Sequence, residues 1–200
     1  MPITFTTDPI IQPEDAHEIF SANDKDERVA IVNDLSGKAK SYMNRVQLNQ
    51  DLDNAIVETH RGAQTPTIFL HAPVYVADFA TYDLQVDVYI DGTLDETFKA
   101  SDDEVIVDST DYSARIDLVG QWFPCTDGSS YIKITYFGGW ETIPGDVYAS
   151  AIMQGRIDLK RMSGVVGAES RSREGETIKV DQGALVKEVK MAWSKYKVIV

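Results

Sequence analysis

A strand, a glycine pair and a helix follow one another over residues 131–162, and this junction constrains the fold more than any other segment. Residues 131–137 alternate in polarity, which predicts a β-strand with one buried face. Gly138-Gly139 ends the strand, because glycine adopts backbone conformations that release the chain from a sheet. Pro144 and Asp146 then suit the first turn of a helix. We therefore expect the chain to change from β to α structure here.

Helical patterns occupy the two ends of the chain. Residues 11–20 and 24–46 have acidic first turns and, in the second, apolar side chains at 3–4 spacing. After the junction, apolar residues at i+4 steps predict a helix over 147–162, and a final amphipathic helix is expected over 185–196. These stripes are interpreted as core. Residues 1–60 as a whole are expected to be helical.

The middle of the chain predicts strands. Residues 82–90 place an apolar or aromatic side chain at every second position, which indicates a strand with one buried face. Asp91-Gly92 follows and is a strong signal for a hairpin turn. Shorter strands are expected over 67–70, 74–77 and 112–118. Short strands with frequent turns favour an antiparallel sheet or a small barrel.

We therefore predict an α+β fold, in which the N-terminal and C-terminal helices pack together as a helical domain with an inserted antiparallel β-sheet or small β-barrel. The expected parts are an N-terminal helical part over 1–66, an inserted β part over 67–139, and a C-terminal helical part over 140–200 that completes the helical domain. A chain of 200 residues can bury such a core. No apolar run approaches the roughly 20 residues that cross a bilayer, so no membrane partner is expected.

Charge is unevenly distributed along the chain, whose net charge is −13. Residues 67–127 contain thirteen acidic and two basic side chains, whereas residues 150–200 contain ten basic and six acidic ones. A sequence-specific DNA-binding protein needs a basic footprint, so this class is disfavoured. The acidic middle is either a solubilising β surface or a surface that faces DNA without holding it. The candidate residues for the second interpretation are Asp83, Asp87, Asp91, Asp102, Asp103 and Glu104.

Reactive side chains are scattered. His17, His60 and His71 are isolated in the sequence, and a structural or surface role is expected for each. Cys125 is the only cysteine, which excludes an intrachain disulfide and fits a cytosolic product. The aspartates of residues 82–91 share one strand face at wide spacing, which is typical of a solvated face and not of a metal site. We therefore expect no catalytic residue, metal site or cofactor.

Three large apolar features have two interpretations. Trp140 and Trp193 are candidate core anchors, but tryptophan also concentrates at subunit interfaces. The last three residues, Val198-Ile199-Val200, are apolar at a chain end, where side chains are normally polar or frayed. Burial of this end against another subunit is therefore our hypothesis.

The order of these segments resembles the head–tail connector, or adaptor, proteins of long-tailed double-stranded DNA bacteriophages. One part of the resemblance is the short helix, acidic break and long helix over residues 13–42. Another is the strand and proline over 67–74. The most specific part is Ile-Thr-Tyr-Phe-Gly-Gly over 134–139 with Ile-Pro-x-Asp-Val over 143–147, which is similar to the family's entry into its penultimate helix.

The resemblance implies a structural, non-enzymatic virion protein. Such connectors form a ring, usually dodecameric, that binds the portal protein at the capsid vertex. They extend the DNA channel, through which the genome passes without specific binding, and carry the next neck or tail protein. The expected location is the virion neck, after synthesis in the host cytoplasm. The candidate residues for subunit or portal contact are Arg171, Arg173, Trp193, Tyr196, Val198, Ile199 and Val200.

Two alternatives to the connector interpretation stay open. One is another phage neck or tail component, such as a stopper or a tail terminator. The other is an acidic metal-dependent hydrolase that uses aspartate pairs from separate strands. The connector interpretation also predicts that the acidic β part and the more basic C-terminal part supply complementary patches for a ring.

Overall fold

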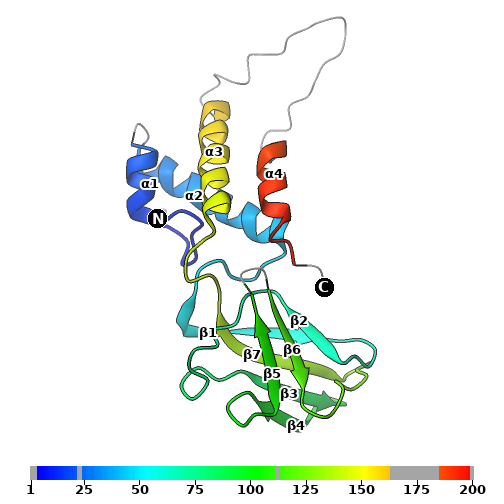
Figure 1. Ribbon diagram of the computed structural model, residues 1–200. Coiled ribbons are helices and arrows are strands. Elements are labelled where there is room, and N and C mark those ends of the chain that lie inside the picture. The colour runs from blue at the N-terminus through cyan, green and yellow to red at the C-terminus, as the bar shows by residue number, and fades with distance from the viewer. Residues whose placement is uncertain (1–3, 22–23, 111–112, 163–184, 199–200) are drawn as a thin grey trace, which may run out of the picture. The chain divides into compact units, whose positions relative to one another are not determined.

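The computed structural model describes residues 4–21, 24–110, 113–162 and 185–198, and within them it contains both helices and antiparallel strands (Figure 1). The α+β class predicted from the sequence is confirmed. The helices are α1 (Pro13–Ile19), α2 (Lys25–Met43), α3 (Gly145–Met162) and α4 (Lys187–Ser194). The strands are β1 (Asp51–His60), β2 (Thr67–Leu70), β3 (Gln85–Ile90), β4 (Thr93–Lys99), β5 (Val105–Ser109), β6 (Ala114–Leu118) and β7 (Tyr131–Gly138). Among the helices of these ranges, none has the length and apolar character needed to traverse a lipid bilayer.

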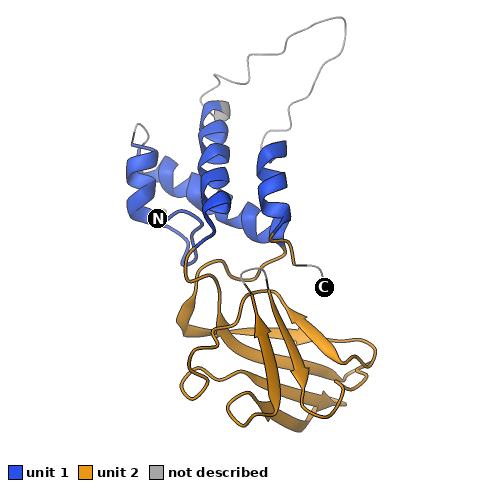
Figure 2. Ribbon diagram, in the orientation of Figure 1, with its two compact units in different colours: residues 1–43, 143–195 blue, residues 44–142, 196–200 orange. Residues whose placement is uncertain are grey.

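The chain divides into two compact units (Figure 2). The helical unit consists of Met1–Met43 and Ile143–Lys195, and the β unit consists of Asn44–Thr142 and Tyr196–Val200. Segments from both ends of the chain therefore belong to the helical unit. The domain boundaries expected at residues 66 and 139 stay a prediction.

α2 forms the longest element of the helical unit. It buries one stripe of apolar side chains at 3–4 spacing, namely Val29, Val32, Leu35, Ala39 and Met43. The helix ends at Met43 because Asn44 adopts a left-handed φ of 55°, a conformation that commonly terminates helices. The prediction that the stripe continues to Val46 is wrong, since Val46 lies beyond this end and is 46% exposed.

α3 begins directly after Pro144, as the junction predicts. Asp146 lies in its first turn, and its carboxylate accepts a hydrogen bond from the Val147 amide at 3.0 Å. The buried face of α3 is broad because the helix contacts both α2 and α4. It carries polar as well as apolar side chains: Val147, Ser150, Ala151, Gln154 and Asp158 are all buried.

The β unit is built from two antiparallel sheets that share one hydrophobic core. The larger sheet has the order β1-β7-β3-β4, and the smaller has the order β2-β6-β5 (Figure 1). The predicted hairpin is confirmed, because Asp91 and Gly92 join β3 to β4 with φ values of 50° and 79°. These positive values are those that the favoured two-residue hairpin turns require.

The β structure begins earlier than the sequence predicts, because residues 51–60 form β1. The helical prediction for residues 1–60 is therefore wrong over this strand. A bulge between Asp51 and Ile56 interrupts its pairing with β7, and the polar residues before the bulge hide the period of two. The strand expected over 74–77 is also wrong, since Val74 forms only an isolated bridge with Gly138.

The glycine pair at the end of β7 lies where three backbone segments meet. The Gly139 amide donates a hydrogen bond to the Pro73 carbonyl at 3.0 Å. A Cβ atom on Gly138 would overlap the Pro73 carbonyl oxygen, and one on Gly139 would overlap the Asn49 carbonyl oxygen. Gly139 also has a φ of 110°, which side chains disfavour. Only glycine fits both positions without displacing the backbone.

Candidate assembly surfaces and a buried polar network

One carboxylate of the β unit faces the shared core. Glu58 lies on β1, two residues after buried Ile56, and it is only 5% exposed. His60 follows two residues later on the same strand. Tyr136 comes from the neighbouring strand β7, and His71 comes directly after β2 in the other sheet. The alternation of strand side chains therefore aims one acid at the space between the sheets.

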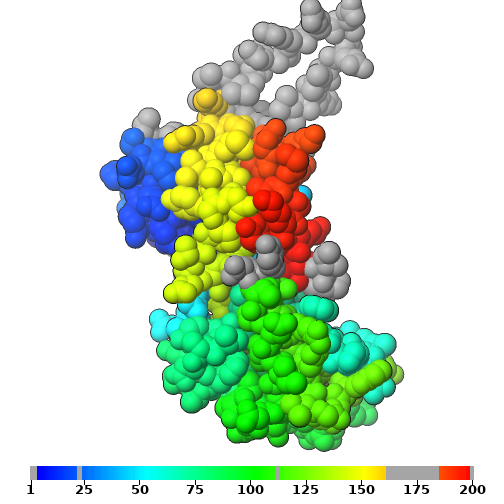
Figure 3. Space-filling view, viewed as in Figure 1, coloured from blue at the N-terminus to red at the C-terminus, as the bar shows by residue number. Residues whose placement is uncertain are grey.

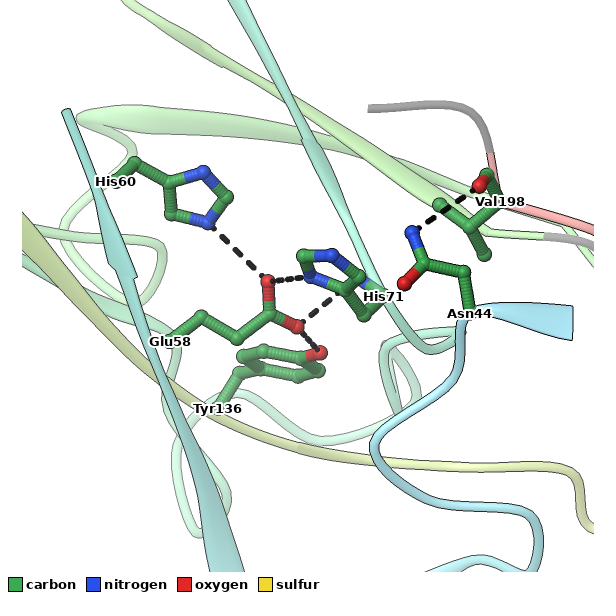
Figure 4. A network of polar contacts seen from close by, with 6 residues as sticks. All are labelled: Asn44, Glu58, His60, His71, Tyr136 and Val198. Atoms are coloured by element: carbon green, nitrogen blue, oxygen red, sulfur yellow. Dashed lines mark hydrogen bonds and ion pairs between the residues drawn. The ribbon is translucent and has the colours of Figure 1, made fainter. Parts of the chain in front are cut away.

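Four hydrogen bonds converge on this carboxylate, as Figure 4 shows. The His71 backbone amide donates to Oε1 at 2.9 Å, and His71 Nδ1 lies 2.6 Å from Oε2. His60 Nε2 lies 3.1 Å from Oε2. The Tyr136 hydroxyl donates to Oε1 in a short hydrogen bond. Both oxygens of Glu58 are thus satisfied by groups from three different segments.

The electrostatics of the network follow from these bonds. Burial opposes ionisation of Glu58, but the hydrogen bonds from His60, His71 and Tyr136 outweigh it and lower its pKa to about 2. The hydrogen bond to Glu58 raises the pKa of His71 above its usual value, against the opposite effect of burial. Burial, followed by the charge of Glu58, raises the pKa of Tyr136. Glu58 is therefore an anion held in place by its donors.

This network links the two sheets. Glu58 receives donors from β1, from β7 and from the segment after β2, so its loss would leave the buried Tyr136 hydroxyl and the partly buried His60 and His71 without this acceptor. The expectation of a structural role is met for His60 and His71, although the sequence treats them as isolated. The sequence signal that could have located the site is Glu58-x-His60 on the same strand face as Ile56.

The end of the described chain lies against the β unit. The Tyr196 ring stands edge-on to Trp140, with ring centroids 5.7 Å apart. The guanidinium of Arg45 lies 4.1 Å from the Trp140 ring centroid, and burial lowers the Arg45 pKa to about 10. Asn44 Nδ2 donates to the Val198 carbonyl at 3.3 Å, which Figure 4 includes. Trp140 is thus an internal anchor.

The predicted contact residues differ in their burial. Trp193 is fully buried in the helical unit, where its Nε1 donates to the Val147 carbonyl at 3.4 Å. Val198 is 5% exposed. The chain itself buries both side chains, and their predicted place at a subunit or portal interface stays a prediction. Tyr196 is half-buried and stays a candidate. Arg171, Arg173, Ile199 and Val200 lie outside the described residues.

The predicted acidic face is not uniform. Asp87 is 5% exposed and accepts hydrogen bonds from Gln85 Nε2 at 2.7 Å and Thr97 Oγ1 at 2.8 Å. Its place on a solvated surface is wrong, because these neighbours cover it, while its assignment to the channel stays a prediction. Asp83 is half-buried and accepts the Ser101 hydroxyl at 2.7 Å. The exposed members are Asp91, Asp102, Asp103 and Glu104, for which the channel assignment stays a prediction.

No group of three or more His, Cys, Asp or Glu side chains in the described ranges is arranged to hold a metal ion. The acids that an acidic hydrolase would pair instead accept hydrogen bonds from hydroxyl and amide groups. Asp83 and Asp87 each do so with residues of adjacent segments of the β unit. Their chemistry in this structure is that of strand and turn contacts.

Three solved structures with a similar fold come from gene transfer agent particles. A chain from the neck of a native gene transfer agent particle, reconstructed with twelvefold symmetry, has a TM-score of 0.56 and 12% identity, covering 100% of this chain and 97% of that chain. A chain from the neck of an empty particle, reconstructed with sixfold symmetry, has a TM-score of 0.53 and 11% identity over 96% and 91% of the two chains.

A third similar chain comes from the virion of a native gene transfer agent particle, with a TM-score of 0.56 and 12% identity over 98% of this chain and 94% of that chain. No family model matches the chain, and a search of curated proteins finds no match. At these identities the likeness shows a shared fold.

Proposed function

We propose that this protein is a structural component of the neck of a phage-like virion. The observation that carries the proposal is the fold likeness, which extends over nearly the whole of both chains for each neck structure. A likeness confined to one unit would be compatible with a shared module in an unrelated protein. The near-complete coverage favours the same kind of part in the same kind of particle.

Within the neck, the connector, or adaptor, position is our specific proposal. The resemblance over residues 134–147 supports it, and the symmetry of the similar necks is compatible with a ring of identical copies. In this role the protein binds the portal, forms a ring, extends the DNA channel and joins the capsid to the tail. The exposed acids at turns, Asp91, Asp102, Asp103 and Glu104, are the candidates for a wall that repels phosphate.

The experiment is to mix the purified chain with portal rings of its own particle and to measure mass and negative-stain images at several concentrations. The expected result is a portal ring that gains one further ring of this chain. A monomer that ignores the portal at every concentration contradicts the connector role. Binding to a preformed portal–connector complex, with none to the portal alone, would assign the chain to the stopper position instead.

A further inference from the structure

α1 presents an acidic stripe to solvent. Glu14, His17 and Glu18 are all exposed, and their i, i+3, i+4 spacing places them on one face of the helix. The opposite side of α1 is anchored by buried Ala16, and the helix is followed by buried Phe20. Residues 4–21 contain no lysine or arginine that would neutralise this stripe.

α4 presents a basic stripe of similar form. Lys187, Lys190, Met191 and Ser194 are exposed, and their i, i+3, i+4, i+7 spacing places them on one helix face. Met191 is 54% exposed, which is unusual for a large apolar side chain on a helix whose other face buries Trp193. An exposed, unbranched methionine between two lysines is suited to an adaptable contact surface.

The charges of both stripes differ from those of three lysines of the helical unit that are paired within it. Lys38, Lys40 and Lys195 each form an ion pair with an aspartate of the same unit. Lys187, Lys190, Glu14 and Glu18 form no ion pair within the residues that the structure describes. The two stripes therefore hold charge that the rest of the unit leaves available.

The stripes belong to helices that lie on either side of α3 in the same unit. In Figure 3 the blue surface of α1 and the red surface of α4 are separated by the yellow surface of α3. The contacts agree, because α4 packs on α2 and α3, whereas α1 packs on α2 and accepts a hydrogen bond from α3 through Asp15 and Tyr148. Two complementary patches on separate edges are what a closed ring of identical subunits requires.

We propose that the α4 stripe of one copy docks on the α1 stripe of the next copy, and that this contact joins neighbours in the ring. The proposal rests on the proposed neck function and names its subunit interface. Lys187 and Lys190 face Glu14 and Glu18 of the neighbour, which fixes orientation and register. Met191 supplies the apolar contact between them. Contact between the α1 stripes of two copies, or between their α4 stripes, would place like charges together. The contact is therefore head-to-tail.

Charge reversal tests the contact. The variant Lys187→Glu/Lys190→Glu and the variant Glu14→Lys/Glu18→Lys each place like charge on both sides of it. Each is expected to raise the concentration for half-maximal assembly by about tenfold or more, as judged by mass distribution. The matched control is Asp95→Lys/Glu96→Lys, which makes the same charge change as the α1 variant at exposed positions of β4. It is expected to assemble like wild type.

Mixing the two variants gives the decisive measurement. In a head-to-tail ring the reversed α4 of one variant meets the reversed α1 of the other, so a 1:1 mixture is expected to form rings with the two variants alternating. Native mass spectrometry reads this as equal numbers of each chain. Circular dichroism of each variant establishes that it is folded before assembly is scored.

The outcomes separate this contact from the neck function. Failure of wild type to assemble, alone or with portal, overturns the connector function, on which a ring of this chain depends. Wild-type rings with unaffected charge variants overturn the contact and leave that function in place. A loss in the β4 control as large as in the α1 variant also overturns it, because the contact would then involve the β unit. Folded variants that lose assembly but do not recover on mixing overturn the pairing of α1 with α4.

Discussion

Two buried carboxylates, one from each unit of this protein, are held differently. Glu58 of the β unit is 5% exposed, and Asp158 of the helical unit is 6% exposed. Glu58 is surrounded by histidine, tyrosine and backbone donors. Asp158 accepts from Lys38 Nζ at 3.1 Å and Gln154 Nε2 at 2.8 Å. A buried charge needs partners in both cases, but only one set includes a permanent cation.

The difference indicates how each unit tolerates change. Lys38 also contacts Asp34 at 2.5 Å, so this cation keeps an acidic partner if Asp158 is lost. The donors around Glu58 all converge on a single carboxylate, and they come from both sheets. The β unit therefore depends on one side chain, whereas the helical unit has an alternative pairing. The β unit should also respond to pH, because its hydrogen bonds lower the pKa of Glu58 and raise that of His71.

The largest expected effect is the loss of Glu58. Glu58→Ala is expected to lower the free energy of unfolding of the β unit by about 3–5 kcal/mol, because it leaves buried donors unsatisfied. Asp158→Ala is expected to lower that of the helical unit by about 1–2 kcal/mol, since Lys38 keeps Asp34. Urea denaturation gives the totals, and amide hydrogen exchange assigns each loss to a unit. Equal losses for the two variants would break the comparison.

The second prediction concerns the backbone of the β unit. Gly139→Ala is expected to lower its free energy of unfolding by about 3 kcal/mol, because the new Cβ overlaps the Asn49 carbonyl at a disfavoured φ. Gly120→Ala is the matched control, since Gly120 has a φ of 74° but no atom near the new Cβ. It is expected to lose about 1 kcal/mol from strain alone. Similar losses at both positions would assign the effect of Gly139→Ala to strain and not to overlap.

These two sites show what the sequence can and cannot predict. The alternation of residues 131–137 and the Asp91-Gly92 turn are local signals, and both were confirmed in β7 and the β3–β4 hairpin. The requirement for glycine at both positions of the pair comes from close contact with Pro73 and Asn49, which lie far away in the sequence. Glu58 likewise acquires its partners only through folding. Local patterns therefore predict elements, while the burial of Asp87 and the network of Glu58 arise from neighbours that no local pattern reveals.

The third prediction is a pH dependence of the β unit. The pKa of Glu58 falls from its usual 4.5 to about 2 on folding, so its stabilisation is present above pH 4.5 and is lost as pH falls towards 2. Between pH 4.5 and about pH 3 this amounts to about 2 kcal/mol. The raised pKa of His71 acts in the opposite direction, with stabilisation present below pH 6.5 and lost as pH rises through the raised value.

Comparison with Glu58→Gln isolates this effect, because other carboxylates titrate equally in both proteins. The difference in free energy of unfolding between wild type and Glu58→Gln, from urea denaturation at each pH, is expected to shrink as pH falls below 4.5. A difference that stays constant from pH 6 to pH 3 would show that protonation of Glu58 does not limit the β unit in acid.

The smallest expected effects are those of alanine substitutions at two glycines of the helical unit. A Cβ on Gly155 of α3 would lie 2.8 Å from Phe20 Cζ and 3.0 Å from Leu35 Cδ1, whereas one on Gly37 of α2 would meet no atom within 4 Å. Gly155→Ala is therefore expected to lower the free energy of unfolding by about 1 kcal/mol. Gly37→Ala is expected to raise the free energy of unfolding by about 0.5–1 kcal/mol, because alanine has a higher helix propensity than glycine at an exposed position within a helix.

Opposite signs at two helical glycines would show that packing of α3, and not helix propensity, determines where this unit accepts a side chain. Thermal denaturation monitored by circular dichroism at 222 nm measures both variants against wild type. A gain in stability for both substitutions would mean that Phe20 and Leu35 move aside at little cost, and that the close approach of α3 is adjustable. The helical unit would then tolerate an added methyl group at Gly155 as well as the loss of one partner of its buried ion pair. The β unit, by contrast, is expected to tolerate neither an added methyl group at Gly139 nor the loss of Glu58.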